Sequence, residues 1–437
     1  MSEFIQAPPI AENFIKTLRK FGYTMQSAIA DIIDNSISAS AKNINIIYLP
    51  NSKWLSIIDD GNGMTKNELI SAMTPGSFDP DLQRQKGDLG RFGSGLKTAS
   101  WSQAKVLVVI TKKKGKIFGA KWDLDIVEKK KGWLLEIISS KDIKSLMKDY
   151  SIKFNENGTA IIWDNIDSIQ GSNKAELEKD QDEKIANTID HIELTYHRFL
   201  DAGPKDSIKI LFNGRVLKAF DPFFTKNSKT HREEAQQVPA GDADGSFIYL
   251  TAFTIPHDKF LSADETNKSE SNDGLYKNQG FYIYREKRLI MHGGWFGLQR
   301  FKEISKLARV MVDVPSSLDS NWVTDVKKSN MNPPPIVRNE MKNLMMRFDG
   351  RSKKVITFSG KRSEKSSNTW EILKLDNKYK FVIKSSNPSF KDFEKTLTKK
   401  QKIIFQKLIT QFQEDLPWEA IYSYFASGDL HYKKDDE

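Results

Sequence analysis

An apolar run at residues 55–58 ends in two carboxylates, the first of them Asp59, and a glycine turn follows. The run has the length and composition of a buried strand, and Gly61 and Gly63 mark the turn. A carboxylate at a strand end can accept a hydrogen bond from a flat ring that carries an amine. Glycines lack Cβ atoms and therefore let such a ring lie against the backbone. The stretch from Asp59 to Met64 thus predicts one half of a ligand site.

A second glycine-rich stretch, residues 90–97, leads into a predicted helix. Its members in chain order are Gly90, Arg91, Phe92, Gly93, Ser94, Gly95, Leu96 and Lys97. Backbone amides at a helix N-terminus attract anions, and a lysine adds positive charge for a polyphosphate. Either glycine stretch alone is typical of an ordinary structural turn. Both stretches together, in this order, favour a nucleotide site.

A third polar pair stands on a predicted helix that covers residues 26–37. Isoleucines at helical spacing give this helix a buried stripe, whereas Asp31 and Asn35 are four residues apart and share the opposite face. A carboxylate can orient a water molecule. An amide oxygen can ligate Mg²⁺, which prefers oxygen ligands and takes few from protein. The pair therefore suits metal-assisted hydrolysis of a phosphoanhydride, although on its own it is also typical of a solvent-facing helix surface.

These three motifs resemble those of the GHKL ATPase superfamily, which includes the DNA gyrase B subunit and MutL. Residues 28–36 are most similar to prokaryotic MORC-like ATPases. The resemblance implies ATP and Mg²⁺ as cofactors, with Asn35 holding the metal and Asp59 binding the adenine amine. The glycines of the first turn would flank the base, and those of the second, with Lys97, would enclose the phosphates. The resemblance also assigns a role to Thr159, whose hydroxyl would support Asp59.

One position departs from the family pattern. Relatives usually carry glutamate as general base four residues before the magnesium asparagine, where this chain has Asp31. Aspartate is shorter, and misplacing a catalytic group by roughly 1 Å can cost on the order of a hundredfold in rate. Ser38 likewise stands where relatives often have aspartate. Two functions therefore stay open: a slow ATPase, and a hydrolysis-poor, nucleotide-gated switch that recruits a protein partner.

The chain has 437 residues, enough for two or three domains, and contains no cysteine. Disulfides and thiolate metal sites are therefore excluded, which suits a reducing compartment. No apolar run is long enough to cross a bilayer, and the first residues lack the pattern of a signal peptide. We expect a cytoplasmic protein without membrane association.

Positive charge is concentrated in residues 351–400. This segment contributes +9 of the formal net charge of +10. A concentrated basic segment attracts the phosphates of nucleic acid irrespective of base sequence. We expect DNA as the partner of this segment, with a solvated, lysine-rich linker as the alternative.

The resemblance implies an α+β fold. A GHKL ATPase domain, residues 1–200, would form a mixed, mainly antiparallel sheet with helices on one face. Residues 64–97 would include a movable lid over the nucleotide. The patterns predict a hairpin over 43–58, strands and turns over 105–163, and a long helix over 174–200 that leads to the next domain.

A smaller α/β domain, residues 201–348, resembles the transducer domain of gyrase, MutL and MORC proteins. We expect this domain to begin with a hairpin at 207–216 and to contain a second hairpin at 279–290. Its polar residues 261–277 predict a flexible insertion. A helix is expected at 336–348.

A lysine of the transducer domain contacts the γ-phosphate in the relatives. Lys327 and Lys328 are the candidates here, and we favour Lys328 as the catalytic one, with ordinary surface lysines as the alternative. Residues 349–437 are expected to form a basic, partly helical region with helices at 397–412 and 418–424. The sequence as a whole predicts a Mg-dependent ATPase that forms an ATP-dependent homodimer and acts on DNA or in defence against foreign DNA.

Overall fold

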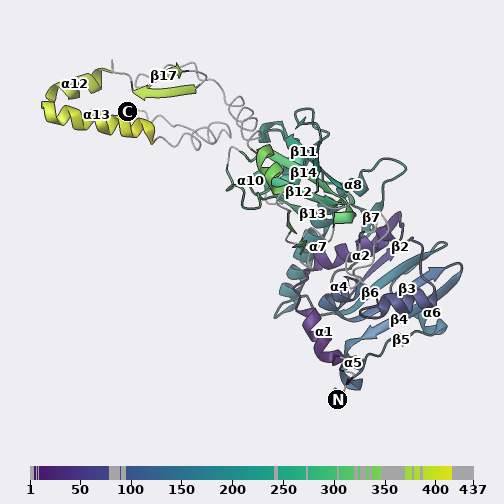
Figure 1. Ribbon diagram of the computed structural model, residues 1–437. Helices are drawn as coiled ribbons and strands as arrows, with labels where there is room; N and C mark the ends of the chain where they lie inside the picture. Colours follow the sequence, from purple (N-terminus) through teal and green to yellow (C-terminus); the bar gives the residue numbers. More distant parts are fainter. Residues whose placement is uncertain are drawn as a thin grey trace.

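The computed structural model of the chain describes residues 4–5, 7, 9–77, 89, 95–240, 245–271, 274–302, 305–318, 323–324, 331–333, 337–345, 370–375, 378–383 and 387–415. Figure 1 shows two sheet domains and a pair of C-terminal helices that lies apart from both. Among the described residues, no helix combines the length and the apolarity that a membrane span requires.

An 8-stranded sheet with the strand order β5-β4-β3-β6-β2-β1-β7-β8 forms the first domain. Its strands are β1 (Asn43–Ile47), β2 (Trp54–Asp59), β3 (Ala104–Lys113), β4 (Lys116–Asp123), β5 (Glu136–Ile137), β6 (Gly158–Ile166), β7 (Lys209–Phe212) and β8 (Arg215–Val216). All neighbouring strands are antiparallel except β1 and β7, which are parallel. The expected α+β class with a mixed, mainly antiparallel sheet is confirmed.

Helices cover this sheet on both faces. They are α1 (Ala11–Arg19), α2 (Met25–Ser38), α3 (Lys66–Met73), α4 (Gly95–Gln103), α5 (Leu124–Lys130), α6 (Ser140–Asp149), α7 (Lys174–Thr195) and α8 (His197–Leu200). Because side chains alternate along a strand, Ile57 of β2 joins the large core that includes α2 and α4, whereas Ile58 joins a separate core with Ile143 of α6. The expected single helical face is therefore supplemented by α6 on the other face.

The range 105–163, expected to hold only strands and turns, contains α5 and α6. Each helix begins at a side-chain cap: Asp123 accepts hydrogen bonds from the backbone N–H groups that follow it, and Ser139 accepts one from Asp142. These caps were the local signals that a strand interpretation overlooked. Three lysines, at 129–131, stand at the end of α5.

The hairpin at 209–216 completes the first sheet instead of opening the second domain, where we expected it. β7 pairs with the free edge of β1, with Ile210 opposite Ile44. The Asn213 side chain accepts a hydrogen bond from Tyr48 N at 2.7 Å and donates one to Tyr48 O at 2.8 Å. The edge of β1 offered unpaired backbone groups, and an apolar strand from a distant part of the chain satisfies them.

A 6-stranded sheet with the order β10-β11-β14-β12-β13, in which β9 also pairs with β11, forms the second domain. Its strands are β9 (His231–Arg232), β10 (Gln236–Pro239), β11 (Phe247–Thr254), β12 (Gly280–Arg285), β13 (Arg288–His292) and β14 (Ala308–Val314). The β12–β13 hairpin agrees with the hairpin expected at 279–290. Helical residues 337–345 pack on this sheet through Val337, Met341 and Leu344.

The polar segment 261–277, expected to be a flexible insertion, forms helices within the second domain. They are α9 (Ala263–Ser271) and α10 (Gly274–Lys277), and the short turns η1 (Asp258–Phe260) and η3 (Ser316–Leu318) lie elsewhere in this domain. Lys268 of α9 contacts the buried carboxylate of Glu193 and lies 3.3 Å from Asp190, both on α7. This polar segment is therefore helical, and its Lys268 pairs with carboxylates of α7.

The C-terminal region contains strands as well as the expected helices. Its strands β17 (Trp370–Leu375) and β18 (Lys378–Ile383) pair with each other. The short strands β15 (Val323–Thr324) and β16 (Met331–Asn332), which also pair with each other, lie before this region, within residues 201–348. The helices are α12 (Pro388–Thr396) and α13 (Lys399–Glu414), of which α13 agrees with the helix expected at 397–412. The second expected helix, 418–424, lies outside the described residues.

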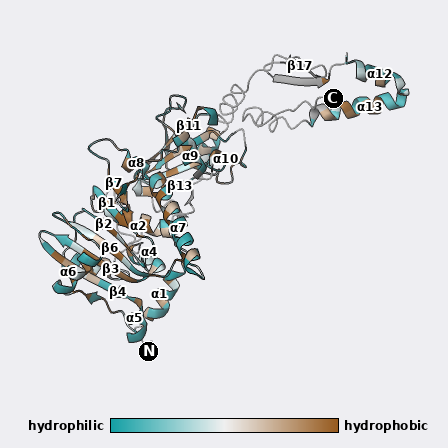
Figure 2. Cartoon of the chain, turned by 180° about the vertical axis from the view of Figure 1, so that it is seen from behind, coloured by the Kyte–Doolittle hydropathy of each residue, from teal (hydrophilic) through white to brown (hydrophobic). Residues whose placement is uncertain are grey.

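Helix α2 lies where the two domains meet, and Figure 2 shows apolar residues gathered around it. Its start is fixed by a capping box in which Thr24 and Ser27 exchange hydrogen bonds. The side chains of Ile29, Ile32 and Ile33 are fully buried. This packing holds the helix in one rotation about its axis and thereby sets where its polar residues point.

Candidate functional site

Asp59 stands at the end of β2 and is surrounded by hydrogen-bond donors. Its Oδ1 accepts from Gly61 N at 2.9 Å and from Thr159 N at 3.2 Å, and its Oδ2 accepts from the Ser36 hydroxyl at 2.8 Å. Only 5% of the residue is exposed. Burial raises the pKa of this carboxyl, and the three neutral donors act in the opposite direction. The site therefore holds a buried acid without any cation among these partners.

The second carboxylate, Asp60, has a different task. Its Oδ1 accepts from the backbone N–H groups of Lys42 and Asn43, each at 2.8 Å, and its Oδ2 accepts from the Asn43 side chain at 2.6 Å. These contacts tie the β2 end to the start of β1. Of the two neighbouring acids, Asp60 is thus committed to the backbone, and Asp59 points into the core beside α2.

The glycine turn after β2 requires its glycines for steric reasons. Gly63 has φ +62°, and a Cβ atom there would lie 2.0 Å from the Lys112 carbonyl oxygen. A Cβ atom on Gly61 would lie 2.9 Å from the Ala39 carbonyl oxygen. The next residue, Met64, donates its backbone N–H to the Thr111 hydroxyl at 2.8 Å. The turn therefore presses directly against β3 and the end of α2.

Thr159 contacts Asp59 through its backbone N–H, whereas the resemblance had assigned this contact to its hydroxyl. The hydroxyl lies 3.3 Å from the hydroxyl of Thr111, which itself donates to Gly158 O at 3.1 Å. β6 and β3 are neighbours in the sheet, with Thr111 opposite Thr159. The two threonines thus form one polar patch between β3 and β6, and β6 is the strand next to the end of β2 that carries Asp59.

Asp31 and Asn35 are four residues apart on α2, and both are half-buried. The Tyr23 hydroxyl donates to Asp31 Oδ2 at 2.8 Å. Burial and the Asp31 charge raise the pKa of Tyr23, so the hydroxyl stays protonated and remains a donor. A Cβ atom on Gly95, the first residue of α4, would lie 3.3 Å from Asp31 Oδ2. The structure thereby brings the second glycine-rich stretch and the Asp31–Asn35 pair into contact at Gly95.

Lys97 lies on α4 and is almost fully buried. Its ammonium group donates to Ala72 O, near the end of α3, at 2.8 Å. Burial lowers the pKa of this lysine to about 8. Leu96 next to it is half-buried and packs against the main core. A lysine charge at this depth is costly unless an anion or a carbonyl oxygen compensates for it.

Some predicted site residues lie outside the described residues. These are Gly90, Arg91, Phe92, Gly93, Ser94, Lys327 and Lys328. The described part of the site therefore comprises the Asp59 end, the polar face of α2 and the start of α4. The donor set on α2 consists of one amide oxygen and one carboxylate, which fits a hard cation such as Mg²⁺ that keeps most of its ligands from water and phosphate.

Sequence reasoning missed several residues that complete this site. Ser36 directly follows Asn35 and donates to Asp59, and Tyr23 and Thr111 contact Asp31 and Met64. For Ser36 the signal was available, because a position four residues after Ile32 and one after Asn35 lies on the flank of the same helix face. No local signal pointed to Thr111, whose role depends on which strand lies next to β6.

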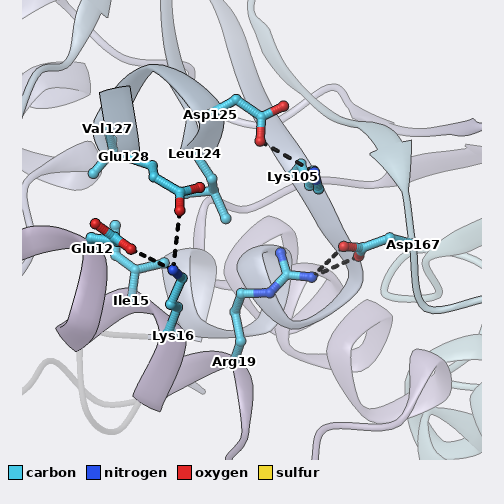
Figure 3. Close-up of a pocket in the computed structure, with 10 residues that line it drawn as sticks. All are labelled: Glu12, Ile15, Lys16, Arg19, Lys105, Leu124, Asp125, Val127, Glu128 and Asp167. Atoms are coloured by element: carbon cyan, nitrogen blue, oxygen red, sulfur yellow. Dashed lines mark hydrogen bonds and ion pairs between the residues drawn. The ribbon is translucent and has the colours of Figure 1, made fainter. Parts of the chain in front are cut away.

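A separate groove of about 240 Å³ lies between α1 and α5 and is lined by charged side chains (Figure 3). Its charges are paired with one another. Arg19 binds Asp167 through two contacts of 2.6 and 2.7 Å, Lys105 lies 3.2 Å from Asp125, and Lys16 bridges Glu12 and Glu128. Its four acidic residues outnumber its three basic ones, so the groove carries no excess positive charge to offer the phosphates of a nucleotide. Of the predicted site residues that belong to the described part of the chain, none lines it.

A family model described as histidine kinase-, DNA gyrase B-, and HSP90-like ATPase matches residues 23–159. The match begins at Tyr23 and ends at Thr159, and it spans the motifs that meet around Asp59, Asp31 and Gly95. A stretch of 105 residues is 34% identical to the ATPase morc-1 of Caenorhabditis elegans. This stretch makes up 24% of the present chain and 12% of that relative, so the likeness concerns a small part of the longer protein.

Proposed function

We propose, from the premise that residues 23–159 belong to the family of histidine kinase-, DNA gyrase B- and HSP90-like ATPases, that this chain binds ATP with Mg²⁺ and hydrolyses it. The membership agrees with the GHKL resemblance of the sequence motifs. One observation carries the proposal: a buried carboxylate, Asp59, is held by neutral donors at a strand end beside a glycine turn. This arrangement suits a base that offers an amine.

The adenine amine would donate to Asp59. Gly61 N, Thr159 N and the Ser36 hydroxyl fix the orientation of this carboxylate, so the ligand does not have to order it on binding. The closely packed turn at Gly61 and Gly63, with Met64, would form the surface against which the base lies. A purine that lacks the amine would leave the buried acid without its ligand partner, which is the basis for discrimination.

Asn35 would hold Mg²⁺ together with phosphate oxygens, and the ion would neutralise charge on the phosphates. Asp31 would accept a hydrogen bond from the attacking water and so orient it toward the γ-phosphate. Tyr23 fixes Asp31 Oδ2, and Gly95 leaves room for the carboxylate between α2 and α4. Lys97 and Lys328 would balance phosphate charge, together with the amides of Gly90, Arg91, Phe92, Gly93, Ser94, Gly95 and Leu96.

The test of this proposal is ATP hydrolysis by the wild type and by Asn35→Ala. The matched control is Asn13→Ala, which makes the same change at an exposed position of α1. We expect hydrolysis in the wild type and in Asn13→Ala, and a loss of at least tenfold in Asn35→Ala that added Mg²⁺ partly restores. Equal rates in the three proteins would remove Asn35 from the mechanism.

A switch that binds nucleotide and hardly hydrolyses it is the second candidate. It is favoured by the short side chain of Asp31 at the position of the general base. Such a protein would recruit a partner while ATP is bound. Asp31→Glu separates the two functions, because a large gain in turnover indicates that the natural residue holds hydrolysis back. A loss of turnover indicates that Asp31 is itself the working base.

We further propose that ATP promotes homodimerisation and that residues 351–400 bind DNA in a cytoplasmic protein that acts on DNA or in defence against foreign DNA. The basic charge of the segment and the MORC-like resemblance support this.

Within the described part of residues 351–400, Lys391, Lys399 and Lys400 are exposed. Replacing these three by glutamine should weaken DNA binding and flatten its salt dependence. The control is the same change at the exposed Lys129, Lys130 and Lys131. Equal losses in both variants would contradict this placement.

A further inference from the structure

A buried ion pair joins the second domain to the helix that carries Asp31 and Asn35. Arg288, the first residue of β13, donates its Nε–H to Asp34 Oδ1 at 2.7 Å. The Arg288 side chain is 7% exposed and that of Asp34 is 2% exposed. Arg288 belongs to the second sheet and Asp34 belongs to α2, so this contact crosses from one domain to the other.

Tyr196 completes the cluster from the side of α7. Its hydroxyl lies 2.7 Å from Asp34 Oδ1 and 2.7 Å from the carbonyl oxygen of Ala30. Burial and the charge of Asp34 raise the pKa of Tyr196, so the hydroxyl remains a donor. The Arg288 guanidinium also lies 5.8 Å from the centre of the Tyr196 ring. Two separate elements, β13 and the end of α7, thus contact the same turn of α2.

This turn of α2, residues 30–34, lies next to the proposed catalytic groups. Ala30 directly precedes Asp31, and Asp34 directly precedes Asn35. A helix turn is a rigid unit, and moving the backbone at residues 30–34 moves both side chains. A displacement of about 1 Å is enough to lower a rate on the order of a hundredfold. The cluster is therefore placed where a small shift has a large effect.

The turn that presents Arg288 is itself in an unusual conformation. Glu286 has φ +48° and Lys287 has φ +70°, although such two-residue hairpin turns usually contain Asn and Gly. Glu286 accepts hydrogen bonds from Ser316 N at 3.1 Å and from the Ser316 hydroxyl at 2.9 Å. The hydrogen bonds from Ser316 of η3 stabilise this strained turn, and the turn fixes the position of Arg288.

We propose that Arg288 is a positioning residue for ATP hydrolysis: through Asp34, it fixes Asp31 and Asn35 and makes their placement depend on the position of the second domain. The inference rests on the proposed function. A buried ion pair gives little net stability, because apolar side chains of similar size often hold a core as well or better. The Arg288–Asp34 pair and Tyr196 instead fix the position of α2. Hydrogen bonds are directional, so they restrict the rotation of the helix about its axis and its shift along that axis more than apolar contacts do.

The experiment compares Arg288→Met with Arg309→Met. Arg309 is the matched control because it is buried in the same sheet and donates to the carbonyl oxygens of Lys306, Ala308 and Leu275, which are all outside α2. For Arg288→Met we expect kcat to fall at least tenfold and the Mg²⁺ concentration for half-maximal activity to rise, while ATP affinity without Mg²⁺ changes less than twofold. An equal fall of kcat in Arg309→Met would overturn the proposal.

A double variant covers the case in which Arg288→Met fails to fold. Asp34→Leu with Arg288→Met removes both charges, and leucine branches at the same carbon as aspartate. This variant should fold as stably as the wild type and still hydrolyse ATP at least tenfold more slowly. Recovery of the wild-type kcat together with stability would show that the pair is merely structural and would overturn the inference.

Hydrogen exchange of the α2 amides gives a readout that needs no nucleotide. We expect the amides of residues 32–38 to exchange at least tenfold faster in the double variant than in the wild type and in Arg309→Met. Unchanged exchange would overturn the anchoring role. A wild type that neither binds nor hydrolyses ATP would instead refute the proposed function. The exchange data would still decide whether Arg288 holds the helix.

Discussion

Two buried aspartates of the first domain, Asp59 and Asp34, differ in the charge of their hydrogen-bond partners. Asp59 accepts only from neutral groups, which are two backbone N–H groups and a hydroxyl. Asp34 contacts the guanidinium of Arg288 and the hydroxyl of Tyr196. A cation satisfies a buried carboxylate and makes it part of the framework, whereas neutral donors orient a carboxylate without cancelling its charge. Asp59 is the acid that can still gain from a ligand.

The largest expected effect concerns the charged pair. Asp34→Asn leaves the Arg288 charge buried without a counter-ion, and we expect the free energy of unfolding to fall by about 3–5 kcal/mol. The control is Asp125→Asn, whose partner Lys105 is exposed and lies 3.2 Å away, with an expected loss below about 1 kcal/mol. Denaturant unfolding of both variants measures the difference. Similar losses would mean that burial does not distinguish the Arg288–Asp34 pair from an exposed ion pair.

The same substitution at Asp59 should change binding and leave stability intact. Burial raises the pKa of Asp59 above its value in the unfolded chain, so ionisation of this group lowers stability as the pH rises through the raised pKa. Asn can accept from Gly61 N and Thr159 N and donate to the Ser36 hydroxyl. We therefore expect Asp59→Asn to unfold no more easily than the wild type at pH 7.

The affinity of Asp59→Asn for ATP should nevertheless fall about ten- to hundredfold, because a hydrogen bond to a charged group contributes about 1.5–3 kcal/mol. Titration calorimetry measures the affinity. Asp60→Asn is the control, because Asp60 holds only the backbone and side chain near Asn43 and should keep the wild-type affinity. If Asp59→Asn lowers the free energy of unfolding and leaves the ATP affinity unchanged, Asp59 has a structural role like that of Asp34 and does not bind the ligand.

Lys97 offers a basic counterpart to Asp59, since it too is buried and held by a neutral partner. Its pKa of about 8 means that the positive charge is lost as the pH rises through that value. Nucleotide phosphates favour the charged form, so ATP affinity should fall about tenfold between pH 7 and pH 9. Lys97→Arg stays charged and should abolish the dependence. A flat profile in the wild type would argue against a phosphate contact by Lys97.

The smallest effect is expected from Ser36→Ala, which removes one of the three donors to Asp59. Gly61 N and Thr159 N still orient the carboxylate, so ATP affinity should fall only a few-fold, by less than about 1 kcal/mol. Ser27→Ala, a change at the exposed start of α2, controls for effects on the helix. A loss as large as that of Asp59→Asn would mean that Ser36 itself contacts the ligand.

Local patterns predicted much of the fold around the site. A threonine and a glutamate three residues later mark the start of α3, and the two residues form a capping box in the structure. The β1–β2 hairpin and the β12–β13 hairpin also agree with their alternating patterns. Around the site, Asp59 lies at the strand end that its apolar run indicated, and Asp31 and Asn35 share one helix face.

What local patterns did not reveal depends on contacts between distant residues. The sequence of the hairpin at 209–216 does not indicate which sheet the hairpin joins. It joins the first sheet because β7 pairs with the free edge of β1. Thr111 became part of the site because β3 lies beside β6. Residues 263–271 form a helix whose Lys268 pairs with carboxylates of α7, far away in the chain.

The sequence by itself determined which chemical groups the site contains, because spacing along a strand or a helix places side chains that are close in the chain. Only the tertiary structure decided how Asp59 is satisfied and that Arg288 reaches Asp34, which is 254 positions earlier in the chain. Such a pairing leaves no periodic trace, since a buried charge needs a partner and the partner can come from any element that packs against it.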